Sequence, residues 1–208
     1  MNKYKKIVSI AATAVMCVAP MSVYAQEAQT DVIEAVAEKK QDTESSSVPV
    51  LQKEGIEISE GTGYDLSKEP GAATVKALEQ GTIVISYKTT SENAIQSLLS
   101  VGNGTKGNQD RHFHLYITNA GGVGMELRNT DGEFKYTLDC PAAVRGSYKG
   151  GRVSNTVALK ADKENKQYKL FANGELIATL DQEAFKFISD ITGVDNVMLG
   201  GTMRQGTV

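Results

Sequence analysis

Residues 112–118 (HFHLYIT) and 123–128 (VGMELR), joined by residues 119–122 (NAGG), form the stretch of sequence that decides the fold. Both halves alternate between apolar and polar side chains with a period of two, which is typical of β-strands that bury one face. The glycine-containing segment between them has the residues that a tight turn needs. The sequence therefore predicts an antiparallel β-hairpin.

The two faces of this hairpin differ in chemistry. One is apolar, and the other carries His112, His114, Tyr116, Glu126 and Arg128. Opposed residues of an antiparallel pair share a face, so we expect Tyr116 opposite Glu126 and His114 opposite Arg128, or a neighbouring even register. Such a polar face is either a ligand platform or an ordinary solvated sheet surface. We interpret it as a ligand platform.

The sequence around the hairpin also predicts short strands separated by turns. The other predicted strands are 56–58, 81–89, 97–101, 134–138, 153–162, 167–172, 175–180 and 196–199. Residues 182–189 are the one good helical candidate. Many short strands with almost no helix predict an all-β fold, a concanavalin-like jelly-roll β-sandwich of two antiparallel sheets. Because the chain ends just after a strand and a glycine-rich loop, we expect the sandwich to be truncated at its C-terminus.

Two segments precede this predicted domain. Residues 1–25 combine a lysine-rich start, an apolar run and small residues at Val23 and Ala25, which predicts a cleaved signal peptide and a secreted, extracellular protein. The apolar run is too short for a membrane span, so we expect no membrane insertion. Residues 26–54 are acidic and serine-rich and predict a flexible linker, and residues 55–208 form the predicted sandwich.

The net charge argues against anionic partners, and the cysteine content argues against an intrachain disulfide. The 208 residues have a formal net charge of −3, and loss of the signal peptide removes three lysines and no acid, which leaves −6. This argues against nucleic acid and anionic membranes as partners. The same cleavage removes Cys17, so Cys140 stands alone and we interpret it as a small buried residue.

The order of several motifs resembles a known family. The segments that carry the resemblance are 83–88 (IVISYK), 96–101 (QSLLSV), 112–117 (HFHLYI), 125–128 (MELR), 173–175 (NGE) and 196–204 (NVMLGGTMR). Together they resemble the N-terminal lectin-like module of bacterial sialidases, the family 40 carbohydrate-binding module, and most of all the modules of secreted intramolecular trans-sialidases. The resemblance implies a monomeric, non-catalytic module that binds terminal sialic acid and tethers a downstream sialidase or trans-sialidase domain to sialylated glycans.

The resemblance also implies which residues bind the sugar. Arg128 and Arg204 match the arginines that hold the sialic acid carboxylate, and Glu126 matches the acid that accepts from the acetamido N–H or a hydroxyl. Tyr116 lines the same pocket, and Ile95 lies where the family contacts the acetyl methyl group. The chemistry agrees independently, because planar guanidinium groups bind carboxylates well.

Other groups of residues could form a metal site or supply a cation to the ligand. His112 and His114 lie two residues apart, a spacing that can hold zinc, but the sequence has no third His and no well-placed Cys to complete the site. Residues 129–132 (NTDG) resemble part of a calcium loop. We therefore expect no cofactor, with structural calcium as the open alternative. The alternative cations for an anionic ligand are Arg111, Arg145 and Arg152.

Catalysis by this chain is not expected. A glycosidase usually needs two carboxyl groups at a fixed separation, and the hairpin's polar face offers only Glu126. The chain also has no tryptophan, whereas the repeated motifs of sialidase catalytic domains contain one. Two alternatives remain at this point: a laminin-G-like protein-interaction sandwich that binds no glycan, and enzymatic activity in the chain itself.

Overall fold

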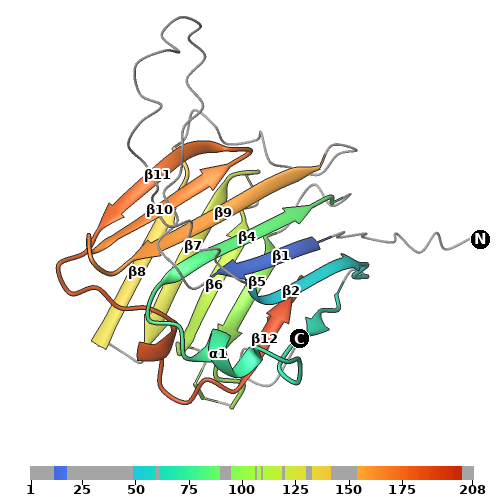
Figure 1. Ribbon diagram of the computed structural model, residues 1–208, viewed down its shortest axis with the longest axis horizontal. Coiled ribbons are helices and arrows are strands. Elements are labelled where there is room, and N and C mark those ends of the chain that lie inside the picture. The colour runs from blue at the N-terminus through green and yellow to red at the C-terminus, as the bar shows by residue number, and fades with distance from the viewer. Residues whose placement is uncertain are drawn as a thin grey trace, which may run out of the picture.

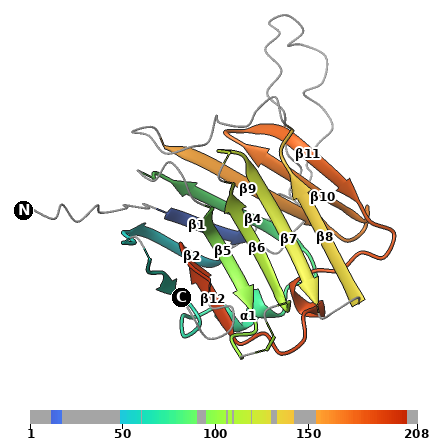
Figure 2. The same ribbon diagram turned by 180° about the vertical axis from the view of Figure 1, so that it is seen from behind.

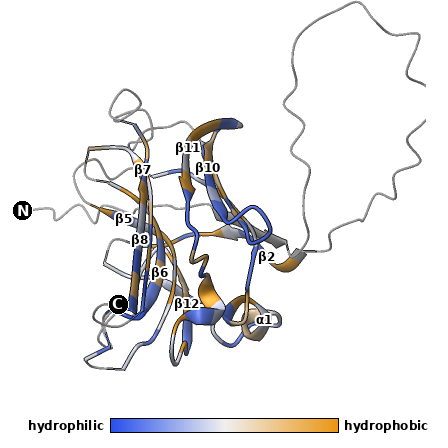
Figure 3. Ribbon diagram, turned by 90° about the vertical axis from the view of Figure 1, so that its left-hand side faces the viewer, coloured by the Kyte–Doolittle hydropathy of each residue, from blue (hydrophilic) through white to orange (hydrophobic). Residues whose placement is uncertain are grey.

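The protein is a sandwich of two antiparallel β-sheets. The computed structural model describes residues 12–17, 49–59, 61–89, 95–105, 107–108, 110–118, 120–129, 133–141 and 154–202. Figures 1 and 2 show one sheet in front of the other from opposite sides, and Figure 3 shows the two layers edge-on. The predicted all-β sandwich is confirmed.

Each sheet contains six strands in the described part of the chain. Sheet A runs, in spatial order, β11 (Glu175–Asp181), β10 (Gln167–Ala172), β9 (Asn155–Asp162), β4 (Gly81–Tyr87), β1 (Ala12–Cys17) and β2 (Pro49–Ile56). Sheet B runs β3 (Tyr64–Asp65), β12 (Asn196–Leu199), β5 (Gln96–Gly102), β6 (His112–Ile117), β7 (Val123–Asn129) and β8 (Phe134–Asp139). The described helices are α1 (Ala72–Lys76) and the 3₁₀-helix η2 (Ile188–Asp190).

The core lies between the sheets because alternate residues of each strand are apolar. In sheet A, Ile83 and Ile85 of β4 are fully buried and pair with Leu159 and Val157 of β9. In sheet B, the apolar face of the hairpin is buried in the same cluster. Burial of each such aliphatic side chain stabilises the folded state by about 1.5–3 kcal/mol relative to leaving it exposed. This apolar layer fixes which face of each sheet points outward.

The hairpin forms as predicted, but its register differs by two residues. Tyr116 pairs with Gly124, His114 with Glu126, and His112 with Arg128. The reason is the turn: the Thr118 N–H donates to the Gly122 carbonyl at 2.8 Å. A five-residue connection therefore closes the strands at Ile117 and Val123. The shift is even, so the apolar and polar faces stay as the sequence predicted.

The N-terminal part of sheet A begins earlier than the predicted domain. Strand β2 starts at Pro49, six residues before the predicted boundary at residue 55. Strand β1, Ala12–Cys17, lies within the predicted signal peptide and pairs with β2 on one side and β4 on the other. Cleavage after Ala25 would remove this strand from the sheet. The signal peptide and its cleavage stay predictions.

The predicted helix at 182–189 is wrong. Only Ile188–Asp190 form a short 3₁₀-helix there. Two carbonyls that a helix would use internally instead accept from tyrosines of the core: the Ala184 carbonyl from the Tyr136 hydroxyl, and the Lys186 carbonyl from the Tyr168 hydroxyl. Tertiary hydrogen bonds thus replace the helical ones.

Two further findings concern single features. Cys140 is a buried free cysteine that is 2% exposed, which confirms the prediction of a small core residue. In the described ranges, no helix has the length and apolar character that a membrane crossing requires.

Candidate functional site

The outer face of sheet B gathers the polar side chains of the hairpin. Across β6, β7 and β8 they form three rows. The rows are His112–Arg128–Lys135, His114–Glu126–Thr137 and Tyr116–Gly124–Asp139. Figure 2 shows this sheet facing the viewer, with β5, β6, β7 and β8 side by side. The sheet thus places the predicted residues Tyr116, Glu126 and Arg128 on one surface.

Arg128 lies between two carboxylates. Its Nη1 is 2.9 Å from Asp110 Oδ1 and 3.2 Å from Glu126 Oε1. All three side chains are about one quarter exposed, so the guanidinium is held in place yet open to a ligand. Both contacts go to the same nitrogen, which leaves the rest of the planar guanidinium group to bind an anion.

Glu126 is also held by a histidine. His112 Nε2 lies 3.2 Å from Glu126 Oε1, and His112 itself is only 1% exposed. The close contact with His112 is the first cause that lowers the pKa of Glu126 to about 2. The positive charges of Arg128 and Lys135 lower it further, whereas burial opposes them. Glu126 is therefore an ionised acceptor at neutral pH.

Replacing Glu126 with glutamine should destabilise the fold at neutral pH and much less in acid. The pKa of Glu126 is near 2 when folded, against an ordinary value of 4.5. Its stabilising effect is therefore present above about pH 4.5 and is lost as pH falls toward 2. The difference in unfolding free energy between wild type and Glu126→Gln should be at most about 3 kcal/mol at pH 7.

Urea unfolding of both proteins at several pH values from neutral to about 2.5 measures this difference. Glu175→Gln on the exposed strand β11 is the control for removal of one carboxylate elsewhere. A wild-type-minus-variant difference that stays constant across the whole range would contradict the assigned pKa.

Tyr116 extends across β7 at Gly124, where no side chain blocks it. Its hydroxyl donates to Asp139 Oδ1 at 3.1 Å, over Gly124 of β7. A Cβ at position 124 would lie 2.8 Å from the Tyr116 ring. Burial and the negative charge of Asp139 raise the pKa of Tyr116. The tyrosine is therefore a neutral donor whose ring covers β7, and the His114 ring packs 5.0 Å from it.

At the edge of the site, strand β5 contacts the last described residues, Gly201 and Thr202. Ser97 Oγ donates to the Gly201 carbonyl at 2.9 Å, and Ser100 Oγ to Thr202 Oγ1 at 3.1 Å. These serines pair with Tyr116 and His114 of β6, so residues 201–202 lie along the same outer face.

Of the two remaining predicted ligand residues, the structure describes Ile95 but not Arg204. Ile95 directly precedes β5, two residues before Ser97, and is 64% exposed. It is a large apolar side chain that is open to solvent. Arg204 lies outside the described residues, as do the alternative cations Arg145 and Arg152.

The metal alternatives gain no ligand set in the described part of the chain. No group there brings together three or more His, Cys, Asp or Glu side chains that could hold a metal ion. His112 instead contacts Glu126. For the calcium alternative, Asn129 bonds to Thr192, and residues 130–132 lie outside the described ranges.

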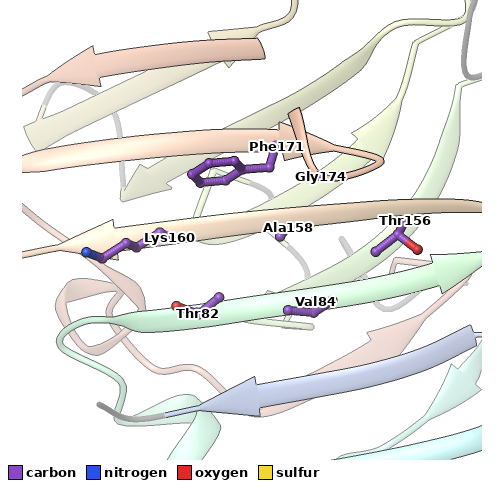
Figure 4. Close-up of a pocket in the computed structure, with 7 residues that line it drawn as sticks. All are labelled: Thr82, Val84, Thr156, Ala158, Lys160, Phe171 and Gly174. Carbon is purple, nitrogen blue, oxygen red and sulfur yellow. The ribbon is translucent and has the colours of Figure 1, made fainter. Parts of the chain in front are cut away.

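A second hollow lies on the opposite side of the molecule. It occupies about 220 Å³ on the outer face of sheet A, around Phe171, Ala158 and Val84 (Figure 4). Its one cation, Lys160, is paired with Asp162 at 3.0 Å. This mostly apolar hollow lacks the guanidinium groups that a carboxylate would select, so it does not compete with the sheet B surface for such a ligand.

Asp110, Asp139 and Gly124 belong to the site but were not predicted from the sequence. Gly124 left a signal, because a glycine inside a strand often marks a close approach. Asp110 is in a loop and Asp139 is two strands from Tyr116, so only the tertiary structure shows these contacts. The sequence predicted that His112 lies on the polar face of the hairpin, but not that it contacts Glu126.

The family model of the sialidase N-terminal domain matches residues 33–208. The chain belongs to this family. An anhydrosialidase of Macrobdella decora is 64% identical over 193 residues, covering 90% of this chain and 25% of the relative. The chain thus spans about a quarter of that relative's length.

Solved structures of this kind of domain are similar to the chain. The CBM40 of a Ruminococcus gnavus IT-sialidase, bound to α2,6-sialyllactose, is 99% identical with a TM-score of 0.72. The match covers 76% of this chain and 84% of that one. The same module bound to α2,3-sialyllactose is 97% identical with a TM-score of 0.71, covering 76% and 83%. The predicted resemblance to the sialidase lectin-like module is confirmed.

Proposed function

We propose that this sialidase N-terminal domain is a non-catalytic module that binds terminal sialic acid on the outer face of sheet B. The observation that carries the proposal is the Arg128 guanidinium, held by Asp110 and Glu126 on the open face that also carries Tyr116. Similar modules bound to sialyllactose support the choice of ligand. The module would tether a sialidase or trans-sialidase catalytic domain to sialylated glycans and raise its effective concentration there.

The proposed ligand contacts follow from the charges of the site. The sialic acid carboxylate pairs with Arg128, but Asp110 and Glu126 already neutralise much of that charge. A second cation is therefore needed, and Arg204 supplies it in this proposal. Ser100 is hydrogen-bonded to Thr202, and Arg204 follows Thr202 by only two residues, a length of chain of at most about 7 Å.

The uncharged part of the sugar has its own partners. Glu126 accepts from the acetamido N–H or a hydroxyl, Tyr116 forms a wall, and Ile95 contacts the acetyl methyl group. A single sugar buries little area, so we expect weak binding, with a Kd of about 0.1–1 mM per site.

The proposed module does not hydrolyse sialosides. A general acid needs a raised pKa, whereas Glu126 has a pKa lowered to about 2 by His112 and Arg128. Asp110, the other carboxylate nearby, forms an ion pair with Arg128. A fluorogenic sialoside should therefore be left intact by this chain, and measurable turnover would refute the non-catalytic assignment.

Calorimetric or NMR titration with α2,3-sialyllactose, α2,6-sialyllactose and lactose tests the binding function. We expect saturable binding of both sialosides and none of lactose, because lactose lacks the carboxylate. Equal binding of all three would refute sialic acid recognition. Binding of none of them would favour the alternative of a laminin-G-like protein-interaction sandwich. The predicted secretion is tested separately, by looking for the protein in the culture medium.

A further inference from the structure

His112 occupies an unusual position for a polar residue of the outer face. It begins β6, pairs with Gly102 of β5 and Arg128 of β7, and is 1% exposed. The glycine explains part of the burial, because a Cβ at Gly102 would lie 3.0 Å from the His112 Cβ. The histidine therefore lies beneath the open surface and not on it.

His112 contacts one of the two carboxylate oxygens of Glu126. The 3.2 Å contact from His112 Nε2 and the 3.2 Å contact from Arg128 Nη1 both go to Oε1. Within the described part of the chain, no hydrogen bond or ion pair goes to Oε2. The carboxylate is thus held on one side by a buried partner and on the other can accept from a ligand.

We propose that His112 is a positioning residue that fixes Glu126 so that Oε2 faces the sugar. The inference rests on the proposed function, because it assigns a role within that binding site. Arg128 contacts the same oxygen, but its side chain is about one quarter exposed, whereas His112 is 1% exposed. A buried histidine has few alternative positions, so it holds Glu126 whether or not a ligand is bound.

The surroundings of His112 allow this role to be measured. Glu126 contacts His112, Arg128 of β7 pairs with it, and the centroid of the His114 ring is 6.4 Å from its own. Arg128 in turn pairs with Lys135 of β8 and contacts Asp110 of the preceding loop. Among the effects on Glu126, the close contact with His112 comes first in lowering the pKa. Loss of that contact should therefore raise the pKa of Glu126 even without a ligand.

The variants His112→Gln and His112→Asn form a matched pair. Both bury a side-chain amide, but only glutamine is long enough to place its N–H near the position of Nε2. We expect His112→Asn to bind sialyllactose about tenfold more weakly, the loss typical of one hydrogen bond to a charged group. We expect His112→Gln to stay within about threefold of wild type.

Carbon-13 NMR of the Glu126 carboxyl group, recorded without ligand, supplies the second measurement. The pKa of Glu126 should be near 2 in the wild type, rise toward 4.5 in His112→Asn and stay low in His112→Gln. A wild-type pKa near 4.5 would overturn the proposal even if neither variant folds. Equal sialyllactose affinity in folded His112→Asn and wild type would also overturn it.

The two readouts separate this inference from the proposed function. If the wild-type protein fails to bind sialyllactose, the proposed function is wrong, whatever the titration of Glu126 shows. If the wild type binds and the two variants bind equally well, the site stands and only the role of His112 falls.

Discussion

Arg128→Ala should reduce sialyllactose binding at least about 100-fold, because it removes the ligand's cation and also exposes two carboxylates to the ligand. Asp110 and Glu126 both pair with Arg128 Nη1, so the variant leaves them facing a third anion. With a wild-type Kd of about 0.1–1 mM, such a variant shows no measurable binding. Titration calorimetry and ligand-observed NMR would check this.

Arg128→Lys separates charge from geometry. It keeps the positive charge but loses the planar group that can hold Asp110, Glu126 and a ligand carboxylate together, so we expect about tenfold weaker binding. The control is Lys169→Ala on β10, which removes one positive charge from the other sheet. We expect wild-type affinity there.

The same loss is expected for Arg204→Ala if this residue supplies the second cation. Circular dichroism should show an intact fold, because the predicted role of Arg204 is ligand binding and not core packing. Wild-type affinity in Arg204→Ala or in Arg128→Ala would remove that arginine from the proposed site.

Gly124→Ala should weaken sialyllactose binding about tenfold or more while adding a single methyl group. The new Cβ would lie 2.8 Å from the Tyr116 ring and closer still to the Asp139 carboxylate. The ring must then leave its place over β7, and its hydrogen bond to Asp139 breaks. Overpacking of this kind destabilises a protein by about 1–3 kcal/mol.

Two comparisons identify the cause of that loss. Tyr116→Phe keeps the ring as a wall and removes only the hydroxyl, so we expect no more than about threefold weaker binding. Ala158→Val adds methyl groups to the outer face of sheet A, where the hollow of about 220 Å³ has room, and should leave binding unchanged. Titrations together with thermal melts would contradict the argument if Gly124→Ala bound as well as wild type.

The strands could be predicted because their signals are local. Strand β4 shows the burial pattern that its alternating side chains predict, and β9 shows the same alternation. The predicted helix failed because distant residues decide there. Residues 182–189 have helical spacing, yet the Tyr136 and Tyr168 hydroxyls donate hydrogen bonds to carbonyls within this segment. The hairpin adopts the neighbouring even register, two residues from the first one considered, because the Thr118–Gly122 hydrogen bond closes a longer turn.

The sequence alone determined that Tyr116, Glu126 and Arg128 share one face, because side-chain direction in a strand alternates with every residue. Only the tertiary structure decided how these residues are held. Asp110, His112 and Asp139 become their partners through loop placement and through pairing across strands. Neither depends on a local period. The alternation fixes the face of a side chain, whereas the register and the loops fix its neighbours.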